Sequence, residues 1–138
     1  MADTSTQVVL DTFRAVEERD HDRLQALYHP DVEFAWPPSL PYGGTFRGTN
    51  QLAPRAVSWE YTWDPLQPTA AERRMDPRVV AAAGADVVVL YHQRGVSVAG
   101  QRFDQEVLGW YRAAEGKFVG AKMFHFDTVA LLNFLADR

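Results

Sequence analysis

The sequence predicts an α+β fold in which one curved antiparallel sheet wraps over a group of helices. Two observations support this prediction. In the first half of the chain the apolar residues recur mostly at helical spacing, whereas after Pro65 the chain consists of extended runs separated by short turns. Helices followed by strands are typical of α+β proteins. Because the sequence contains no internal repeat, low-complexity segment or linker, we expect a single domain over residues 1–138.

The N-terminal part of the chain predicts two helices. After a start rich in Thr and Ser, apolar residues at roughly helical spacing predict a first helix over residues 5–19; they are Val8, Leu10, Phe13, Ala15 and Val16. Leu24, Leu27 and Tyr28 mark a second, shorter helix. We expect this helix to end at Pro30, because proline cannot continue a helix.

A strand is predicted over residues 31–36. A loop rich in Pro and Gly follows it and leads to Gly48, after which a third helix is expected from about Thr49 to Trp63. After Pro65 the sequence predicts three further strands, with room for a fourth. The expected order of elements is therefore ααβαβββ, with one optional strand.

The two longest extended runs are expected to pair as a hairpin. Residues 85–98 form one strand and residues 101–112 the other, and Ala99-Gly100 joins them. A second turn, at Glu115-Gly116, leads into the last strand over residues 118–126. A short C-terminal helix is expected after this strand.

The composition of the chain excludes several classes of function and partner. The chain has 138 residues and a formal net charge of −4, and no block of Lys or Arg forms a basic stripe, so nucleic acid is not an expected partner. It contains no Cys, which excludes disulfides, thiolate catalysis and Cys-ligated zinc. The first residues are polar and acidic, unlike a signal peptide, and no apolar stretch is long enough to cross a bilayer. We therefore expect a cytoplasmic protein without a membrane partner.

The segment from Asp20 to Gly48 is the most informative part of the chain. It contains Asp20-His21-Asp22, the run from Leu24 to Phe34, and the Pro/Gly-rich run from Trp36 to Gly48. This segment resembles the opening of the SnoaL-like polyketide cyclases, which belong to the NTF2-like superfamily. The resemblance implies a cone: a curved antiparallel or mixed sheet wrapped over three helices of the N-terminal half, with a short C-terminal helix. The 8 Phe, 5 Tyr and 4 Trp could line such a cone, although aromatic residues also fill ordinary cores.

A second resemblance helps to choose the residues expected inside the cone. The run Leu108-Gly109-Trp110-Tyr111 resembles the matching strand of limonene epoxide hydrolases and ketosteroid isomerases, which share this fold. Side chains alternate between the two faces of a strand, so the match implies which face is interior. With two residues added from the third helix, the expected substrate-binding residues are Phe34, Trp36, Trp59, Trp63, Gln93, Leu108, Trp110, Lys122 and Phe124.

The resemblance does not transfer the chemistry of either relative. Where the epoxide hydrolases carry an Asp-Arg-Asp set, this chain has Tyr91, Gln93 and Phe124. Where the ketosteroid isomerases place a protonated Asp, it has Leu108. Any acid–base chemistry must therefore use other residues.

Four residues are the catalytic candidates: Glu106, Tyr91, Asp104 and Tyr42. A carboxyl group in an apolar cone has its charged form disfavoured, and it can therefore exchange a proton near neutrality. Glu106 is the first candidate for this role and Asp104 the second. Tyr91 and Tyr42 would polarise an oxygen of the substrate, while Gln93 orients the substrate. Alternatively, Asp104 and Glu106 face water at a solvated strand end, and Tyr42, in the loop near the mouth, only packs a turn.

For several other residues the sequence allows two interpretations. Trp59 and Trp63 form either an aromatic wall or plain helix core. Lys122 is either a buried cation that pairs with an inner carboxylate or ordinary surface. Asp127 either supplies the acid that the resembling cyclases take from the last strand or caps the C-terminal helix, which runs through Leu135, and capping is favoured. The histidines give no metal-ligand spacing, and three are expected to be packing or interface residues: His29, His92 and His125.

These features lead to one expected function and two alternative functions. We expect a cofactor-independent cyclase or isomerase of secondary, polyketide-type metabolism, with acid–base catalysed ring closure by epoxide opening or aldol attack in an aromatic-lined cavity. The alternatives are an epoxide hydrolase and a protein that binds a hydrophobic small molecule without turnover. Sheets of this family commonly pair through their convex faces, so we expect a homodimer formed by Val119, Ala121 and Met123 beside His125.

Overall fold

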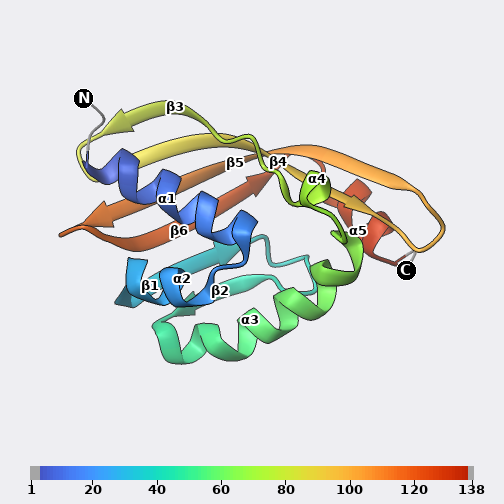
Figure 1. The fold of residues 1–138 in the computed structure, drawn as a ribbon, viewed down its shortest axis with the longest axis horizontal. Helices are drawn as coiled ribbons and strands as arrows, with labels where there is room; N and C mark the ends of the chain where they lie inside the picture. The colour runs from blue at the N-terminus through green and yellow to red at the C-terminus, as the bar shows by residue number, and fades with distance from the viewer. Residues whose placement is uncertain (1–3, 137–138) are drawn as a thin grey trace.

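Residues 4–136 fold into helices and one six-stranded sheet (Figure 1). The computed structural model describes these residues, apart from the side chains of residues 53–58. The helices are α1 (Thr4–Glu18), α2 (His21–Leu27), α3 (Thr49–Trp63), α4 (Ala70–Arg73) and α5 (Thr128–Ala136), with a 3-10 turn η1 (Asp64–Leu66) after α3. The strands are β1 (Tyr28–Trp36), β2 (Gly44–Arg47), β3 (Arg78–Ala83), β4 (Asp86–Val96), β5 (Arg102–Ala114) and β6 (Lys117–His125).

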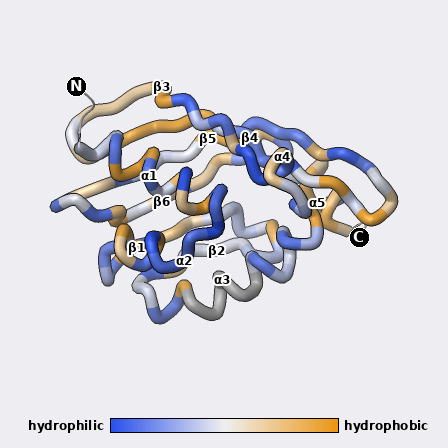
Figure 2. Tube along the Cα trace, viewed as in Figure 1, coloured by the Kyte–Doolittle hydropathy of each residue, from blue (hydrophilic) through white to orange (hydrophobic). Residues whose placement is uncertain are grey.

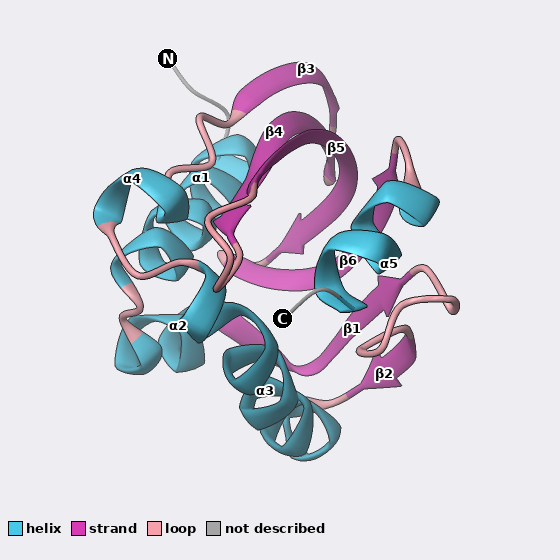
Figure 3. Cartoon of the chain, turned by 90° about the vertical axis from the view of Figure 1, so that its right-hand side faces the viewer, coloured by secondary structure: helices cyan, strands magenta, loops and turns pink. Residues whose placement is uncertain are grey.

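The sheet is mixed and strongly curved. Its strand order is β2-β1-β6-β5-β4-β3. Neighbouring strands are antiparallel except β1 and β6, which are parallel. In Figure 3 the strands β4 and β5 bend around an interior, and α5 lies at the end of the sheet that faces the viewer. The predicted α+β class and the curved sheet are therefore confirmed.

Two segments differ from the prediction near Pro30 and in the loop before Gly48. Strand β1 begins at Tyr28, so Pro30 lies inside the strand and not at its start. Proline cannot donate a ladder hydrogen bond, and the pairing of β1 with β6 is interrupted between Tyr28 and Glu33. The loop contains the short strand β2, which pairs with β1 and brings Phe46 opposite Phe34. The optional fourth strand after Pro65 is β3.

Two apolar clusters fill the interior. The larger one joins α1 to the inner face of the sheet, and its most buried members include Val9, Val32, Val89, Val107 and Phe118. The smaller one joins the end of α3 and the loop after β1 to α5, and it includes Leu40, Trp63, Leu66, Leu131 and Phe134. Helix α5 therefore closes one end of the curved sheet.

The β4–β5 hairpin does not have the predicted turn. A two-residue turn at Ala99-Gly100 would place Tyr91 opposite Leu108. Instead Val96 pairs with Arg102, and Tyr91 lies opposite Val107. The Ser97 N–H donates to the Gln101 carbonyl at 2.8 Å and the Gly100 N–H to the Ser97 carbonyl at 2.9 Å, which leaves a three-residue loop. Gly100 adopts φ 86°, a left-handed conformation that glycine reaches without steric cost.

The change of turn moves every side chain of β5 to the other face. A register shift of one residue exchanges the two faces of a strand, because side chains alternate with a period of two. The buried residues of β5 are therefore Val107, Gly109, Tyr111 and Ala113. The predicted interior set of this strand is exposed, namely Asp104, Glu106, Leu108 and Trp110.

A bulge in β6 produces a second exchange of faces. Ala113 pairs with Phe118, but Arg112 pairs with Gly120, so Val119 is an extra residue in β6. Phe118 is buried as part of the inner face, and beyond the bulge the buried positions are Ala121 and Met123. Lys122 and Phe124, predicted to point inward with Phe118, are exposed on the outer face. The interior position predicted for Phe124 is wrong, and for Lys122 the structure has the surface position, one of the two interpretations that the sequence left open.

Candidate functional site

A cavity of about 240 Å³ is lined by helices α1 to α3, the inner face of the sheet and the segment after η1. Its lining is largely aromatic and includes Phe13, Tyr28, Phe34, Trp36, Trp59 and Phe118. Several of these rings pack on one another: Phe34 stacks on Trp36 with 5.2 Å between ring centroids, and Trp36 stacks on Trp59 with 6.1 Å. Rigid aromatic walls suit a flat apolar ligand.

Five of the predicted site residues line this cavity. They are Phe34 and Trp36 on β1, Trp59 on α3, and Tyr91 and Gln93 on β4. The sequence pattern located them because β1 and β4 have the predicted alternation, with Tyr91 and Gln93 on the same face. Trp63 is fully buried in the smaller apolar cluster, one turn along α3 from Trp59.

The other predicted residues of β5 and β6 lie on the outer face of the sheet. Leu108, Trp110 and Phe124 are 38%, 47% and 47% exposed. The ammonium group of Lys122 lies 5.6 Å from the centre of the Phe124 ring, a cation–π contact on the surface. Glu106 is exposed on the same outer face and does not line the cavity, so its predicted acid–base role on a ligand held there is not supported.

Asp104 belongs to an ionic network on the outer face. One carboxylate oxygen lies 2.7 Å from Nδ1 of His92, and the other accepts a hydrogen bond from Nε of Arg94 at 3.1 Å. Arg94 also donates to Asp76 at 2.9 Å. Partial burial raises the pKa of Asp104, but the bonds from His92 and Arg94 outweigh it and hold the pKa below its usual range. Asp104 is therefore a charged structural group, and Figure 2 shows this region near α4 and β4 as strongly hydrophilic.

Tyr91 and Tyr111 form a polar pair inside the aromatic cavity. Both line it, from neighbouring strands β4 and β5. Burial raises the pKa of both phenols, so both stay protonated, and a side-chain hydrogen bond links their hydroxyl groups. When Tyr111 donates within the pair, Tyr91 can donate its own proton to a ligand oxygen. Sequence analysis missed Tyr111 because the wrong hairpin register placed it on the outer face.

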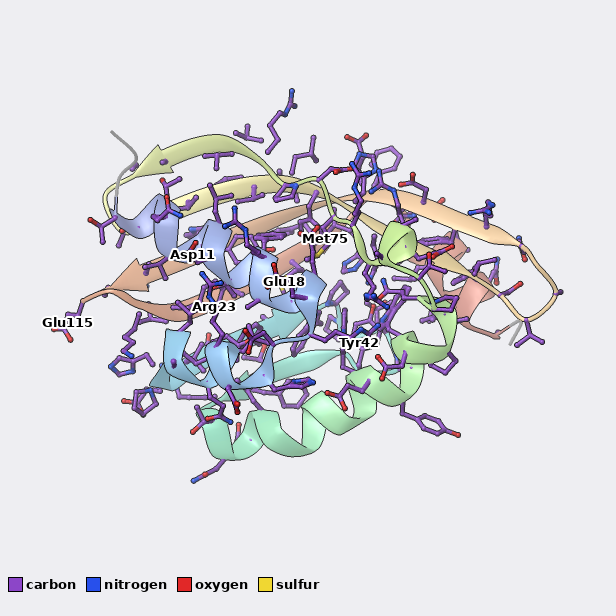
Figure 4. The ribbon with its side chains drawn as sticks, viewed as in Figure 1. Asp11, Glu18, Arg23, Tyr42, Met75 and Glu115 are labelled. Carbon is purple, nitrogen blue, oxygen red and sulfur yellow. The ribbon has the colours of Figure 1, made fainter. Side chains whose placement is uncertain are left out.

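Tyr42 lies in the interior, behind the aromatic wall, and Figure 4 labels it near the middle of the molecule. It is only 2% exposed, and its ring centroid lies 4.9 Å from that of Trp59. A close turn brings it there: a Cβ atom on Gly43 would lie 2.0 Å from the Pro37 carbonyl oxygen. Among the described residues, three buried polar atoms near the wall have no hydrogen-bond partner of standard geometry: Tyr42 Oη, Trp63 Nε1 and Gln93 Oε1. Since Gln93 also lines the cavity, its amide oxygen is available to a ligand donor.

Charged residues mark the more exposed part of the cavity, which we call the mouth. They are Arg19, His21, Glu60 and Arg73. His21 Nε2 lies 3.2 Å from Glu60 Oε1, and these side chains are 64% and 38% exposed. The sequence analysis did not select them, although Glu60 directly follows Trp59 and His21 lies in the segment that carries the resemblance. Their proximity depends on the tertiary structure, which brings α2 and α3 to the same cavity.

Asp127 has the capping role favoured from the sequence. Its carboxylate accepts a hydrogen bond from the Ala130 N–H at 3.0 Å, at the start of α5. Among residues 4–136, no group of three or more His, Asp or Glu side chains could hold a metal ion. In the same part of the chain, no helix has the length and apolar character needed to span a bilayer.

Solved structures share this fold over nearly the whole chain. TerC, in a crystal structure obtained with polyporic acid, is 20% identical, with a TM-score of 0.82 and coverage of 97% of this chain and 99% of TerC. An NTF2-like protein of unknown function from Burkholderia pseudomallei K96243 is 21% identical, with a TM-score of 0.81 and coverage of 97% and 98%. A candidate SnoaL-like polyketide cyclase from Jannaschia sp. CCS1 is 18% identical, with a TM-score of 0.67 and coverage of 98% and 93%. At these identities the likeness shows the NTF2-like fold alone.

Sequence comparison supplies the family. No curated protein matches this chain. The sequence profile of the SnoaL-like domain, however, matches residues 9–121, which include most of α1, the aromatic cavity wall of the sheet and the first half of β6. The chain therefore belongs to the SnoaL-like domain family and has the NTF2-like fold.

Proposed function

We propose that this chain is a SnoaL-like cyclase or isomerase that acts by acid–base catalysis on an aromatic or polyketide-type small molecule. The observation that carries the proposal is the Tyr111–Tyr91 pair, which presents a protonated phenol to the interior of an aromatic cavity. A phenol in a water-poor pocket is a strong donor to an oxygen that becomes negative during reaction. The family match and the polyketide cyclase among the structural relatives support this class of reaction.

The proposed mechanism uses residues at two positions of the cavity. Glu60, held beside His21 at the mouth, removes a proton from a carbon next to a substrate carbonyl. The electron pair moves to the carbonyl oxygen, where Tyr91 stabilises the enolate by donating a hydrogen bond. The enolate carbon then attacks an electrophilic carbon of the same molecule, either a carbonyl or an epoxide, and closes the ring. The bond that breaks, the carbonyl π bond or an epoxide C–O bond, leaves its electron pair on oxygen, and this oxygen takes up the proton held by Glu60, which returns to the carboxylate. Gln93 orients a second polar group, and the aromatic walls hold the reactive conformer.

Two glutamates distinguish this mechanism from the one predicted by sequence alone. Glu60→Gln and Glu106→Gln make the same chemical change, at the cavity mouth and on the outer face respectively. With a panel of polyketide-type ketones and epoxides, we expect Glu60→Gln and Tyr91→Phe each to lower kcat by about 10²-fold or more, and Glu106→Gln to leave it unchanged. Full activity of Glu60→Gln, or loss of activity in Glu106→Gln, would contradict this assignment.

Two alternative functions of the same cavity would give different experimental results. An epoxide hydrolase would incorporate oxygen from ¹⁸O-labelled water into the product, whereas a cyclase that uses an internal nucleophile would not. A protein that binds without turnover would bind the ligand and release it unchanged. In that case Glu60→Gln would alter neither product formation nor the chemical state of the ligand.

We also propose that two copies of the chain pair through the outer face of β4, β5 and β6. Leu108, Trp110 and Phe124 form an exposed apolar surface there, and a two-fold axis would cover it with the same surface of a second copy. This surface replaces the one predicted from sequence, because Ala121 and Met123 are buried in the interior. We expect light scattering to give twice the chain mass, and Phe124→Glu to give a folded monomer. A monomeric wild-type protein would exclude the dimer.

A further inference from the structure

Arg73 lines the cavity mouth without a carboxylate partner. It is the last residue of α4, and its Nη1 donates to the Gln67 carbonyl oxygen at 3.4 Å. Its Nε atom is buried and has no acceptor, and no carboxylate of the described residues lies within ion-pair distance of its guanidinium. A buried donor without an acceptor is unfavourable, and most so when it belongs to a charged group. An anionic ligand group would satisfy it.

Arg19 adds a second positive charge to the same part of the cavity. It follows α1 and also lines the cavity. Burial lowers the pKa of Arg19, and the positive charge of Arg73 lowers it further, while Glu60 raises it. The two guanidinium groups are therefore close enough to repel each other. An anion placed between them would relieve this repulsion.

The carboxylates of this region already have partners. Asp64 forms an ion pair with Arg19, and Glu60 lies beside His21. Gln67 accepts a hydrogen bond from Arg19 through its side-chain oxygen at 3.5 Å, but it is neutral. The charge of Arg73 thus remains unpaired among the described residues.

The backbone conformation of Arg19 is a separate observation. Arg19 has φ 55°, in the left-handed region at the C-terminal end of α1, where helices usually place glycine. The Asp20 N–H donates to the Ala15 carbonyl and the Arg19 N–H to the Val16 carbonyl, which is the usual ending of a helix with a glycine at this position. The backbone geometry of this helix end suits glycine better than arginine. An unfavourable conformation retained at a cavity is a reason to examine the side chain for function.

We propose that Arg73, assisted by Arg19, binds an ionised carboxylate of the ligand, so that the cavity selects aromatic acids over neutral aromatic compounds. Arginine suits this role because its planar guanidinium can donate two parallel hydrogen bonds to one carboxylate. The carboxylate would lie at the mouth, with the ring system between the walls that contain Phe34, Trp36 and Trp59. This inference rests on the proposed function only in using the same cavity, and it does not require turnover.

The test compares two probes with the same rings, 2-naphthoate and 2-naphthylmethanol, at pH 7.5. Binding is followed by tryptophan fluorescence, since Trp36 and Trp59 line the cavity. We expect the wild-type protein to bind the acid at least about tenfold more tightly than the alcohol, in line with a charge-assisted hydrogen bond. Arg73→Gln should remove this preference without weakening the binding of the alcohol. Arg78→Gln is the matched control, because Arg78 is exposed on β3 and does not line the cavity, and it should keep the full preference.

Arg19→Gly is a second test variant, and this substitution should not disturb folding. Glycine suits the backbone at this position, so a reduced preference for the acid in this variant would reflect loss of the guanidinium and not unfolding. Equal binding of both probes to the wild-type protein, or an unchanged preference in Arg73→Gln, would overturn the inference and leave the cyclase proposal intact. Failure of both probes to bind would overturn it together with the use of the cavity as a ligand site.

Discussion

The ring of Tyr111 lies directly over Gly109 on the inner face of β5. A Cβ atom added to Gly109 would be 2.2 Å from the Tyr111 hydroxyl oxygen and from its ring carbon Cζ. The Tyr111 ring can occupy this position only because Gly109 has no side chain. The hydroxyl of Tyr111, which supports Tyr91, therefore depends on a glycine two residues earlier in the same strand.

Gly109→Ala should displace the Tyr111 ring and break its bond to Tyr91. We expect a loss of stability of about 1–3 kcal/mol, the usual cost of overpacking a core, together with lower activity toward any substrate that Tyr91 serves. Denaturant unfolding and turnover on the same preparation measure the two effects. Tyr111→Phe, which keeps the ring and removes the hydroxyl, should reduce activity with less loss of stability. Normal activity in both variants would show that Tyr111 does not support Tyr91.

Two left-handed residues give a matched pair of glycine substitutions. Glu115 has φ 55° in the tight turn between β5 and β6, far from the cavity (Figure 4), and Arg19 has the same φ at the end of α1. Glu115→Gly should stabilise the protein by roughly 0.5–1 kcal/mol, because the steric cost exceeds the entropy cost of glycine. Arg19→Gly should be nearly neutral, because the same gain is offset by loss of the partly exposed ion pair with Asp64. Urea unfolding of both variants checks the difference; a large loss for Arg19→Gly would indicate a structural role for its side chain.

Stability should decrease between pH 6.5 and pH 4 because of His125. Burial lowers the pKa of His125 from 6.5 to about 4, and its Nδ1 atom is buried without a partner among the described residues. In this range the unfolded chain binds a proton that the folded chain does not, so the stability present above pH 6.5 is lost as the pH falls toward 4. The shift corresponds to about 3 kcal/mol. His125→Gln should flatten this part of the profile in thermal unfolding scans, and an unchanged slope would assign the loss to other groups.

The cap of α5 can be tested at Asp127. Asp127→Ala should cost about 1 kcal/mol of stability, since the Ala130 N–H would lose its acceptor, and Asp127→Asn should cost much less. If Asp127 were the catalytic acid instead, Asp127→Asn would abolish activity while leaving stability almost unchanged. Unfolding and turnover measurements on the two variants therefore separate the two interpretations left open by the sequence.

The residues located correctly from sequence are those that depend on local pattern. Phe34 and Trp36 share a face of one uninterrupted strand segment, and Tyr91 and Gln93 share a face of another, so alternation alone grouped them. Asp127 was identified as a cap from its position before the helix. The charged mouth was missed because its residues come from three helices and the link after α1, namely His21, Glu60, Arg73 and Arg19. No spacing along the chain shows that such residues converge.

The sequence by itself determined the α+β class, the order of the longer helices and strands without β2 and α4, the turn at Glu115-Gly116 and the cap of the last helix. All of these follow from the preferences of neighbouring residues. The tertiary structure decided which faces of β5 and β6 look into the cavity, through the three-residue loop after Ser97 and the extra residue at Val119. Alternation gave a mixed signal here, because the outer set contains the apolar residues Leu108, Trp110 and Phe124 as well as the charged residues Asp104, Glu106 and Lys122. The hydrogen-bond register between strands, set by the loop and the bulge, decides which set is buried.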